Sequence, residues 1–334
     1  MGNQTNLYRE LIKYPNIISF LKGTSDLQEL FSLLPNISKE RILLYESLYN
    51  SIGNTPVVKI NLTNRNLLYV KQECENGLGN NHYSRYWIIH LALAESLGLI
   101  EPKKTTILEI SSGSSGIALS MACELLGYSL RIIVPEMLPK GRIEAMESDC
   151  TTIIKVPGYL AECKRYFMEE KNKYDFYIPN HSEEKADLIT DVFSRIAVEF
   201  YRDYGNVDNA ILGLGNGSST YSVGKTLKKY CPKCKVFSFY PSLTSGKVVY
   251  GLYADNLSFI HIIKAQKEGL VYKDIFTDEF LIDEVAHAFS QQPIITQWGH
   301  SSLFAIDIAN KLAEHSEGES FFTIAYDKIE RYHY

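Results

Sequence analysis

The chain has 334 residues, of which 45% are hydrophobic and 22% are charged, and its formal net charge is −5. This length favours two domains with a large core, while the small negative charge argues against nucleic acid or an anionic membrane as a partner. Six scattered cysteines, a polar N-terminus and the lack of a long apolar run predict a cytoplasmic protein with reduced thiols.

Residues 1–45 show two short helical patterns interrupted by Pro15 and Pro35, which predict an N-terminal helical extension. Short apolar runs then alternate with helical patterns, an order typical of parallel sheets covered by helices on both faces. The expected strands cover residues 105–110, 130–135, 151–156, 209–215, 235–241 and 320–326. One helix is expected after a polar turn within residues 75–100. Further helices are expected over residues 116–127, 141–149, 159–173, 185–205, 218–230, 281–292 and 303–315.

We therefore expect an α/β fold with two domains. Residues 63–186 are assigned to a smaller N-terminal α/β domain. Residues 46–62 together with 187–334 are assigned to a larger C-terminal α/β domain.

Two strand-to-helix turns are candidate anion sites, because ligands of open parallel sheets bind where strands end and helices begin. The first turn offers serine hydroxyls and helix N–H groups to a carboxylate, through Ser111, Ser112, Gly113, Ser114 and Ser115. The second suits a phosphate, through Gly215, Asn216, Gly217, Ser218 and Ser219. Either turn alone could equally be a tight connection that needs glycine for its backbone.

The cysteine pair Cys231 and Cys234 has the spacing of a metal or redox motif. A structural zinc site needs four ligands, and no second pair accompanies it. The pair is predicted to lie in a helix-to-strand turn, and no metal site is expected.

Taken in order, several segments resemble the cysteine synthase and cystathionine beta-synthase family, the fold type II pyridoxal-phosphate enzymes. The stretch "SIGNTPVVKI" is similar to the family's opening motif, "ILEISSGSSGIAL" to its asparagine loop, and "GLGNGSSTYS" to its phosphate loop. The segments "IIVPEMLPKGRIEAMES" and "DKIERYH" resemble later family motifs. The resemblance runs from about residue 46 to the end and implies pyridoxal phosphate as the cofactor.

Residue by residue, the resemblance implies that the phosphate loop of the family corresponds to residues 215–219. It also implies that Ser301 or Ser302 contacts the pyridine nitrogen, with Leu303 where the family has a glycine that leaves room for the ring. In the asparagine loop, Ser114 stands where the family has asparagine, and a serine is shorter and has one donor fewer.

The family's lysine is the main departure. Its motif is represented here by "ENGLGNNHYSRYW", in which Arg85 matches the family arginine and Tyr83 or His82 takes the lysine position. A Schiff base requires a primary amine, which neither a phenol nor an imidazole provides. Lys71 lies in a strand where relatives also have a lysine, and Lys140 lies in a surface segment.

Two functions remain open. The chain could be a degenerate member, a pseudoenzyme that binds a small anionic or amino-acid-like ligand or acts as a partner or regulator. Alternatively, it could be an enzyme of amino-acid metabolism with altered lyase or beta-replacement chemistry, using noncovalent pyridoxal phosphate or a preformed aldimine. In that case Tyr83 or His82 would serve as acid or base beside Arg85. Ordinary cysteine synthase activity ranks last, and binding of no cofactor is as plausible as binding without a Schiff base.

Two more histidines are of interest. His300, before the serine pair, is either a new functional group or a plug in the ring site, and His181 is expected in an exposed loop. Exposure is also the simplest expectation for His82. Because relatives are homodimers, the resemblance implies a homodimer, with a protein partner possible.

Overall fold

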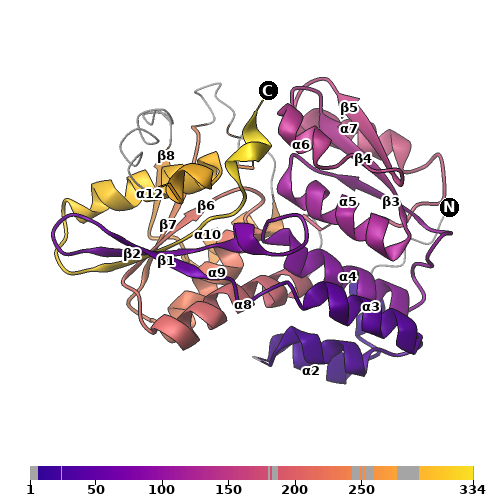
Figure 1. The fold of residues 1–334 in the computed structure, drawn as a ribbon, viewed down its shortest axis with the longest axis horizontal. Helices are drawn as coiled ribbons and strands as arrows, with labels where there is room; N and C mark the ends of the chain where they lie inside the picture. The colour runs from indigo at the N-terminus through magenta and orange to yellow at the C-terminus, as the bar shows by residue number, and fades with distance from the viewer. Residues whose placement is uncertain are drawn as a thin grey trace. The chain divides into compact units, whose positions relative to one another are not determined.

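The computed structural model describes residues 7–23, 25–179, 181–182, 187–242, 249, 251–252, 259–276 and 293–333. It divides into two compact units, and Figure 1 labels many of their helices and strands. Among the described residues, unit 1 contains those up to Gly53 and those from Asn76 to Val192. Unit 2 contains those from Asn54 to Glu75 and from Phe193 to His333.

Unit 1 begins with the helices α1 (Leu7–Leu11), α2 (Pro15–Lys22), η1 (Leu27–Leu33) and α3 (Lys39–Tyr49). Proline is tolerated in the first turn of a helix, and Pro15 is the first residue of α2. The Ser38 side chain caps α3 by accepting from Arg41 N. The expected N-terminal helices are confirmed, and α3 packs against α4 (Tyr83–Ser96) as part of unit 1.

The sheet of unit 1 is parallel and contains, in this order, β3 (Thr106–Ile110), β4 (Ser129–Pro135) and β5 (Thr151–Val156). Its connecting helices are α5 (Ser114–Leu126), α6 (Lys140–Glu144) and α7 (Leu160–Glu170), with α6 shorter than the sequence predicts. As expected, Gly127 ends α5 in the left-handed conformation at φ 80°.

Helix α4 is buried on nearly all of its sides. Twelve of its residues are buried, including the polar Ser84, Arg85 and His90. It contacts α3 and α5, so few of its positions face water. A helix enclosed by neighbouring helices gains stability from packing all around its surface.

Unit 2 contains a six-stranded sheet in the order β1-β2-β9-β6-β7-β8. Among the strands that the structure describes, only the β1–β2 pair of this sheet is antiparallel, and its other pairs are parallel. The strands are β1 (Val57–Asn61), β2 (Leu67–Lys71), β6 (Asn209–Gly213), β7 (Lys235–Tyr240), β8 (Lys273–Phe276) and β9 (Ser320–Ile324). Together the two units have the expected α/β architecture with mainly parallel sheets.

Helix α8 (Asp187–Tyr204) begins in unit 1 and continues into unit 2. The other described helical elements of unit 2 are η2 (Glu73–Glu75), α9 (Ser218–Tyr230), α10 (Ile260–Lys267), η3 (Ile295–Gln297), α12 (His300–Ala313) and η4 (Ile329–Tyr332). In Figure 1, α12 covers one face of the six-stranded sheet and α9 the other. Cys231 and Cys234 lie between α9 and β7, which confirms the predicted turn. The helix expected at 281–292 lies outside the described residues.

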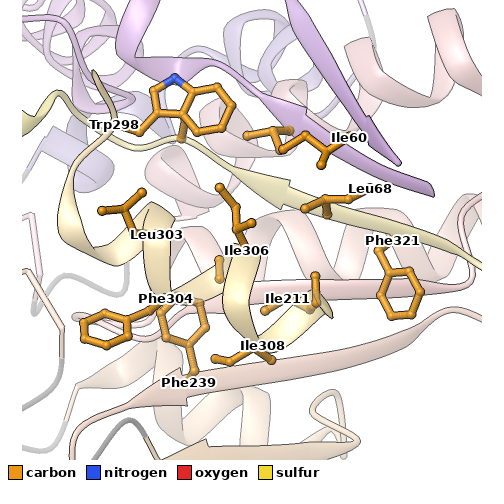
Figure 2. Packing of buried hydrophobic residues seen from close by; sticks show 14 of the residues in the cluster. Ile60, Leu68, Ile211, Phe239, Trp298, Leu303, Phe304, Ile306, Ile308 and Phe321 are labelled. Carbon is orange, nitrogen blue, oxygen red and sulfur yellow. The ribbon is translucent and has the colours of Figure 1, made fainter. Parts of the chain in front are cut away.

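The core of unit 2 lies between α12 and the sheet (Figure 2). Leu303 and Ile306 of α12 meet Ile211 of β6 and Phe239 of β7 there. The Leu303 side chain is only 2% exposed. Leu303 is therefore a core residue of α12, and its size is explained by packing.

The division of the chain differs from the expected boundaries at three places. Residues 46–53, expected in the larger domain, belong to unit 1. Strand β2 pairs with β1 and β9, so residues 63–75 join the large sheet instead of the smaller domain. The later boundary falls between Val192 and Phe193, inside α8. The physical reason is that β2 completes the large sheet through hydrogen bonds to two strands, which the apolar pattern of one strand does not reveal. Among the described helices, none is long and apolar enough for a membrane crossing.

Candidate functional site

The turn before α4 is held by Ser51 and Gly53, which open the "SIGNTP" stretch and belong to unit 1. The Asn76 side-chain oxygen accepts from Gly53 N at 2.9 Å, and Gly77 N donates to Ser51 O at 2.8 Å. A Cβ on Gly77 would lie 2.1 Å from Ser51 Oγ, so only glycine fits. The motif that carries the family resemblance thus fixes where α4 begins.

Helix α4 starts at Tyr83. The Asn81 side-chain oxygen accepts from Tyr83 N at 2.9 Å, while Ser84 Oγ donates to Asn81 O at 2.8 Å. Arg85 is 1% exposed, His82 is 7% exposed and Tyr83 is half-buried. The expectation that His82 is a solvent-exposed turn residue is wrong, because the turn before α4 folds back into unit 1.

Tyr83 contacts two histidines. Its ring centroid lies 4.4 Å from that of His82 and 5.6 Å from that of His181, the latter in an edge-to-face arrangement. His181 is 4% exposed, so the expected position in an exposed loop is also wrong. The rings of Trp87 and Tyr86 also pack on His181, which explains its burial.

The predicted carboxylate loop, residues 111–115, joins β3 to α5. Ser111 Oγ accepts from Gly113 N at 3.1 Å and from Gly116 N at 2.8 Å. Ser111 therefore uses its hydroxyl to satisfy backbone donors at the start of α5. Ser112 and Ser114 are half-buried. These contacts assign Ser111 to supporting the loop.

Arg142 of α6 lies against this loop. Its Nη1 donates to Ser112 O at 2.7 Å, and its side chain is among the most completely buried of the chain. A Cβ on Gly113 would lie 2.0 Å from the same Nη1, so the glycine makes room for the guanidinium. A permanent positive charge beside the N-terminal end of α5 makes the loop favourable for an anion.

Ser115, Trp87 and His181 form a buried polar cluster. Trp87 Nε1 donates to Ser115 Oγ at 3.1 Å, and Ser115 Oγ lies 3.2 Å from His181 Nε2. His181 Nδ1 lies 3.1 Å from Glu109 Oε2, at ion-pair distance but without hydrogen-bond alignment. The structure thus brings together the start of α4 and the serine loop through His181.

His90 lies next to this cluster on α4. Its Nδ1 is 2.8 Å from the Tyr86 hydroxyl and its Nε2 is 2.9 Å from the Tyr177 hydroxyl. Burial lowers the pKa of His90 to about 3, with a further contribution from His181. His90 is therefore neutral at physiological pH and links two tyrosines.

Sequence reasoning missed Glu109, Arg142 and Trp87 as neighbours of the serine loop. Glu109 is the charged residue of an otherwise apolar strand that ends at the loop, a signal that was available. Arg142 lies in the segment "IIVPEMLPKGRIEAMES", which resembles a family motif but gave no indication that this arginine contacts the serine loop. Trp87 offered no signal, because it reads as a core aromatic residue.

The nearest lysine before α4 is held inside unit 2. Lys71 Nζ donates to Thr55 O at 2.6 Å and lies 2.8 Å from Glu199 Oε2. Thr55 Oγ1 in turn donates to Glu73 Oε1 at 2.7 Å. Lys140 is exposed on α6 and pairs with Glu144 at 3.3 Å. These contacts give Lys71 a structural partner and leave Lys140 at the surface.

The predicted phosphate loop of unit 2 caps its own helix. The Asn216 side-chain oxygen accepts from Ser218 N at 3.1 Å and from Ser218 Oγ at 2.7 Å. Gly217 has φ 85°, and a Cβ on Gly215 would lie 2.5 Å from Gly251 O. Ser219, which follows at the start of α9, is 8% exposed. The loop keeps glycines at the start of α9, but the Ser218 N–H and the Ser218 hydroxyl already donate to Asn216.

Ser301 and Ser302, at the start of α12, differ in their surroundings. Ser302 is fully buried and its Oγ accepts from Tyr326 N at 3.2 Å, so it supports the chain after β9. Ser301 is 6% exposed. The His300 ring lies 4.2 Å from that of Tyr332, which places it in an aromatic contact within unit 2.

The comparison with family models decides the relationship. The model described as "Pyridoxal-phosphate dependent enzyme" matches residues 48–257, more than half of the chain. The chain belongs to this family. The match includes both candidate loops and the start of α4.

Curated relatives are cysteine synthases and cystathionine beta-synthases. The chain is 29% identical to cysteine synthase of Flavobacterium sp. over 60% of its own length and 66% of that protein. It is 25% identical to cystathionine beta-synthase of Rattus norvegicus over 84% of its length and 53% of that protein. The alignments thus span less than two thirds of these relatives' lengths.

Solved structures support the fold. A hydrogen sulfide-producing enzyme from Fusobacterium nucleatum is 28% identical, with a TM-score of 0.70, and the match covers 85% of this chain and 98% of that one. O-ureido-L-serine synthase has a TM-score of 0.75 at 22% identity, covering 85% of this chain and 92% of that one. The chain therefore has the fold of the type II pyridoxal-phosphate enzymes.

The residues present fit the family cofactor only in part. Gly217, Ser219 and the start of α9 could hold a phosphate, and Ser301 could face a ring nitrogen. For covalent attachment, residues 72–102 offer no lysine, and Lys71 is engaged by Thr55 and Glu199.

Proposed function

We propose that the protein binds a small amino-acid-like carboxylate at residues 111–115 and does not attach pyridoxal phosphate through a lysine. It would then be a cysteine-synthase-like binding protein, or a regulator, without beta-replacement activity. The observation that carries the proposal is the buried Arg142 guanidinium behind the serine loop, 2.7 Å from Ser112 O.

Three features support a carboxylate ligand. The guanidinium keeps its charge at any physiological pH, because the pKa of arginine exceeds 12. The N-terminal end of α5 adds partial positive charge, and the half-buried Ser114 at its first position can donate a hydroxyl. An anion at the loop would meet all three.

Ser114→Asp is expected to weaken carboxylate binding at least about tenfold. A negative charge at the first turn favours helix α5 itself, so the fold should be retained. The same charge would repel a carboxylate a few ångströms away by about 4 kcal/mol at an effective dielectric constant of about 20. Titration calorimetry with L-serine and succinate measures the loss of affinity.

Ser129→Asp is the matched control, because Ser129 is exposed on β4 and receives the same change in charge. It should leave the affinity unchanged. Equal affinity of both variants and the wild type for the carboxylates would contradict the proposed site.

Reductive trapping tests the cofactor. Protein mixed with pyridoxal phosphate and treated with borohydride should yield no stoichiometric adduct on a single lysine, because residues 72–102 offer no amine. Peptide mass spectrometry measures the adduct, with a lysine-bearing cysteine synthase as the positive control. One lysine carrying the cofactor in most molecules would overturn the proposal in favour of an ordinary synthase.

A second candidate function is an enzyme that uses Tyr83 as acid or base. It is favoured by the contact of Tyr83 with the rings of His82 and His181. Under the binding proposal, Tyr83→Phe should leave carboxylate affinity within about threefold, because the ring packing remains. A turnover with an amino-acid substrate that the wild type shows and Tyr83→Phe lacks would instead favour the enzyme.

A further inference from the structure

Three side chains of unit 1 have the order of an acyl-transfer triad. Ser115 Oγ lies 3.2 Å from His181 Nε2, and His181 Nδ1 lies 3.1 Å from Glu109 Oε2. Their exposed fractions are 6%, 4% and 4%. Each histidine nitrogen therefore faces one partner, as in a Ser-His-acid arrangement.

The backbone places these residues by regular structure. Glu109 lies on β3, and Ser115 is the second residue of α5, directly after the turn that leaves β3. The segment before His181 runs beside β3, with Leu108 N donating to Tyr177 O at 2.9 Å and Tyr177 N to Thr106 O at 3.0 Å. In α/β-hydrolases the nucleophilic serine likewise lies where a strand leads into a helix.

The neighbours favour the tautomer that such chemistry needs. The carboxylate charge 3.1 Å from His181 Nδ1 favours the tautomer that carries its proton on this nitrogen. His181 Nε2 is then an acceptor for the Ser115 hydroxyl proton. Trp87 Nε1 can only donate, so it contacts Ser115 Oγ without competing for that proton.

We propose that Ser115, His181 and Glu109 cleave esters of short acyl groups. Ser115 Oγ would attack the ester carbonyl carbon while its proton passes to His181 Nε2. The carbon–oxygen bond to the alcohol then breaks, and His181 returns the proton to the departing oxygen. Water attacks the acyl-serine by the same route and releases the acid, so no other reactant is needed.

The start of α5 stabilises the negative oxygen that forms in this step. The first N–H groups of a helix have no acceptor inside it, and the helix dipole adds positive potential there. Gly113 N and Gly116 N donate to Ser111 Oγ, and we assign this role to the N–H of Ser115, the second residue of α5. Glu109 acts as a positioning residue, because it orients His181 and does not touch the ester.

This inference deepens the proposed function and rests on it in one respect, since the acyl compound would bind at the same serine loop. The test uses the full chain with neutral probes, 4-nitrophenyl acetate for turnover and a fluorophosphonate for labelling. A fluorophosphonate loses fluoride when a serine oxygen attacks its phosphorus. Peptide mass spectrometry then identifies the labelled residue.

We expect the label on Ser115 and ester turnover that falls on the order of 10³-fold in Ser115→Ala and His181→Gln. Glu109→Gln should lower kcat with little change in KM, and Glu109→Asp should restore part of kcat. Ser129→Ala, at an exposed position on β4, is the control and should keep wild-type turnover. Circular dichroism checks the fold of each variant.

If Ser115→Ala does not fold, Ser115→Cys replaces it, and rapid alkylation of that cysteine that depends on His181 supports the triad. Absence of both turnover and label in the wild type, or label on another residue, overturns the triad. If the protein binds carboxylates but does not cleave esters, the triad proposal is rejected and the binding proposal stands. If the protein cleaves esters but does not bind carboxylates, the binding proposal is rejected and the triad proposal stands.

Discussion

Glu95→Ala should lower the free energy of unfolding by about 3 kcal/mol or more. Glu95 accepts hydrogen bonds from Arg41 at 2.7 Å, from the Tyr45 hydroxyl at 2.7 Å and from the Tyr128 hydroxyl at 2.6 Å. Its side chain is only 9% exposed. The substitution would leave the half-buried Arg41 without its carboxylate and deprive two tyrosine hydroxyls of an acceptor, and chemical denaturation measures the loss.

The effect of Glu95→Ala should depend on pH in a defined direction. Burial alone would raise the pKa of Glu95, but hydrogen bonds from Arg41, Tyr128 and Tyr45 outweigh it and lower the pKa below its usual 4.5. A depressed carboxyl pKa stabilises the fold above the unfolded pKa, and this contribution is lost as pH falls through the folded value. The difference between wild type and variant should therefore be full at neutral pH and shrink in acid.

Glu101→Ala is the control for this prediction. Glu101 pairs with Lys104 at the surface, where the two side chains are 62% and 71% exposed. Exposed pairs contribute about 0–1 kcal/mol, so this variant should unfold close to the wild type. Similar losses for both variants would show that the buried cluster around Glu95 does not tie α3 to α4.

Lys71→Met should also destabilise the protein by about 3 kcal/mol or more. Lys71 is 1% exposed, lies 2.8 Å from Glu199 Oε2 and donates to Thr55 O at 2.6 Å. Methionine keeps the length of the side chain but leaves Glu199 without this cation and Thr55 O without this donor. Thermal and denaturant unfolding measure the effect.

Lys273→Met is the matched control, because Lys273 is an exposed residue of β8 in the same sheet. It should change the free energy of unfolding by no more than about 0.5 kcal/mol. A loss below about 1 kcal/mol for Lys71→Met would mean that the Lys71–Glu199 pair is not required for the fold of unit 2.

Sequence reasoning located the elements well where one strand or helix carries its own signal. Strand β5 and helix α9 have the predicted bounds, and Gly127 ends α5 as expected. It misjudged burial at His82 and His181, because the residues that cover them come from other parts of the chain. The serine loop was recognised, but not the guanidinium beneath it or the carboxylate beside it.

The amino-acid sequence by itself determined the family, the α/β architecture and the lack of lysine between Lys71 and Lys103, because these follow from local pattern and residue identity. Tertiary structure alone decided that Glu109, Ser115 and His181 meet, although up to 72 positions separate them in the sequence. It also decided that Lys71 is paired with Glu199. Distances of this kind arise from packing between distant segments, which no short stretch of sequence encodes.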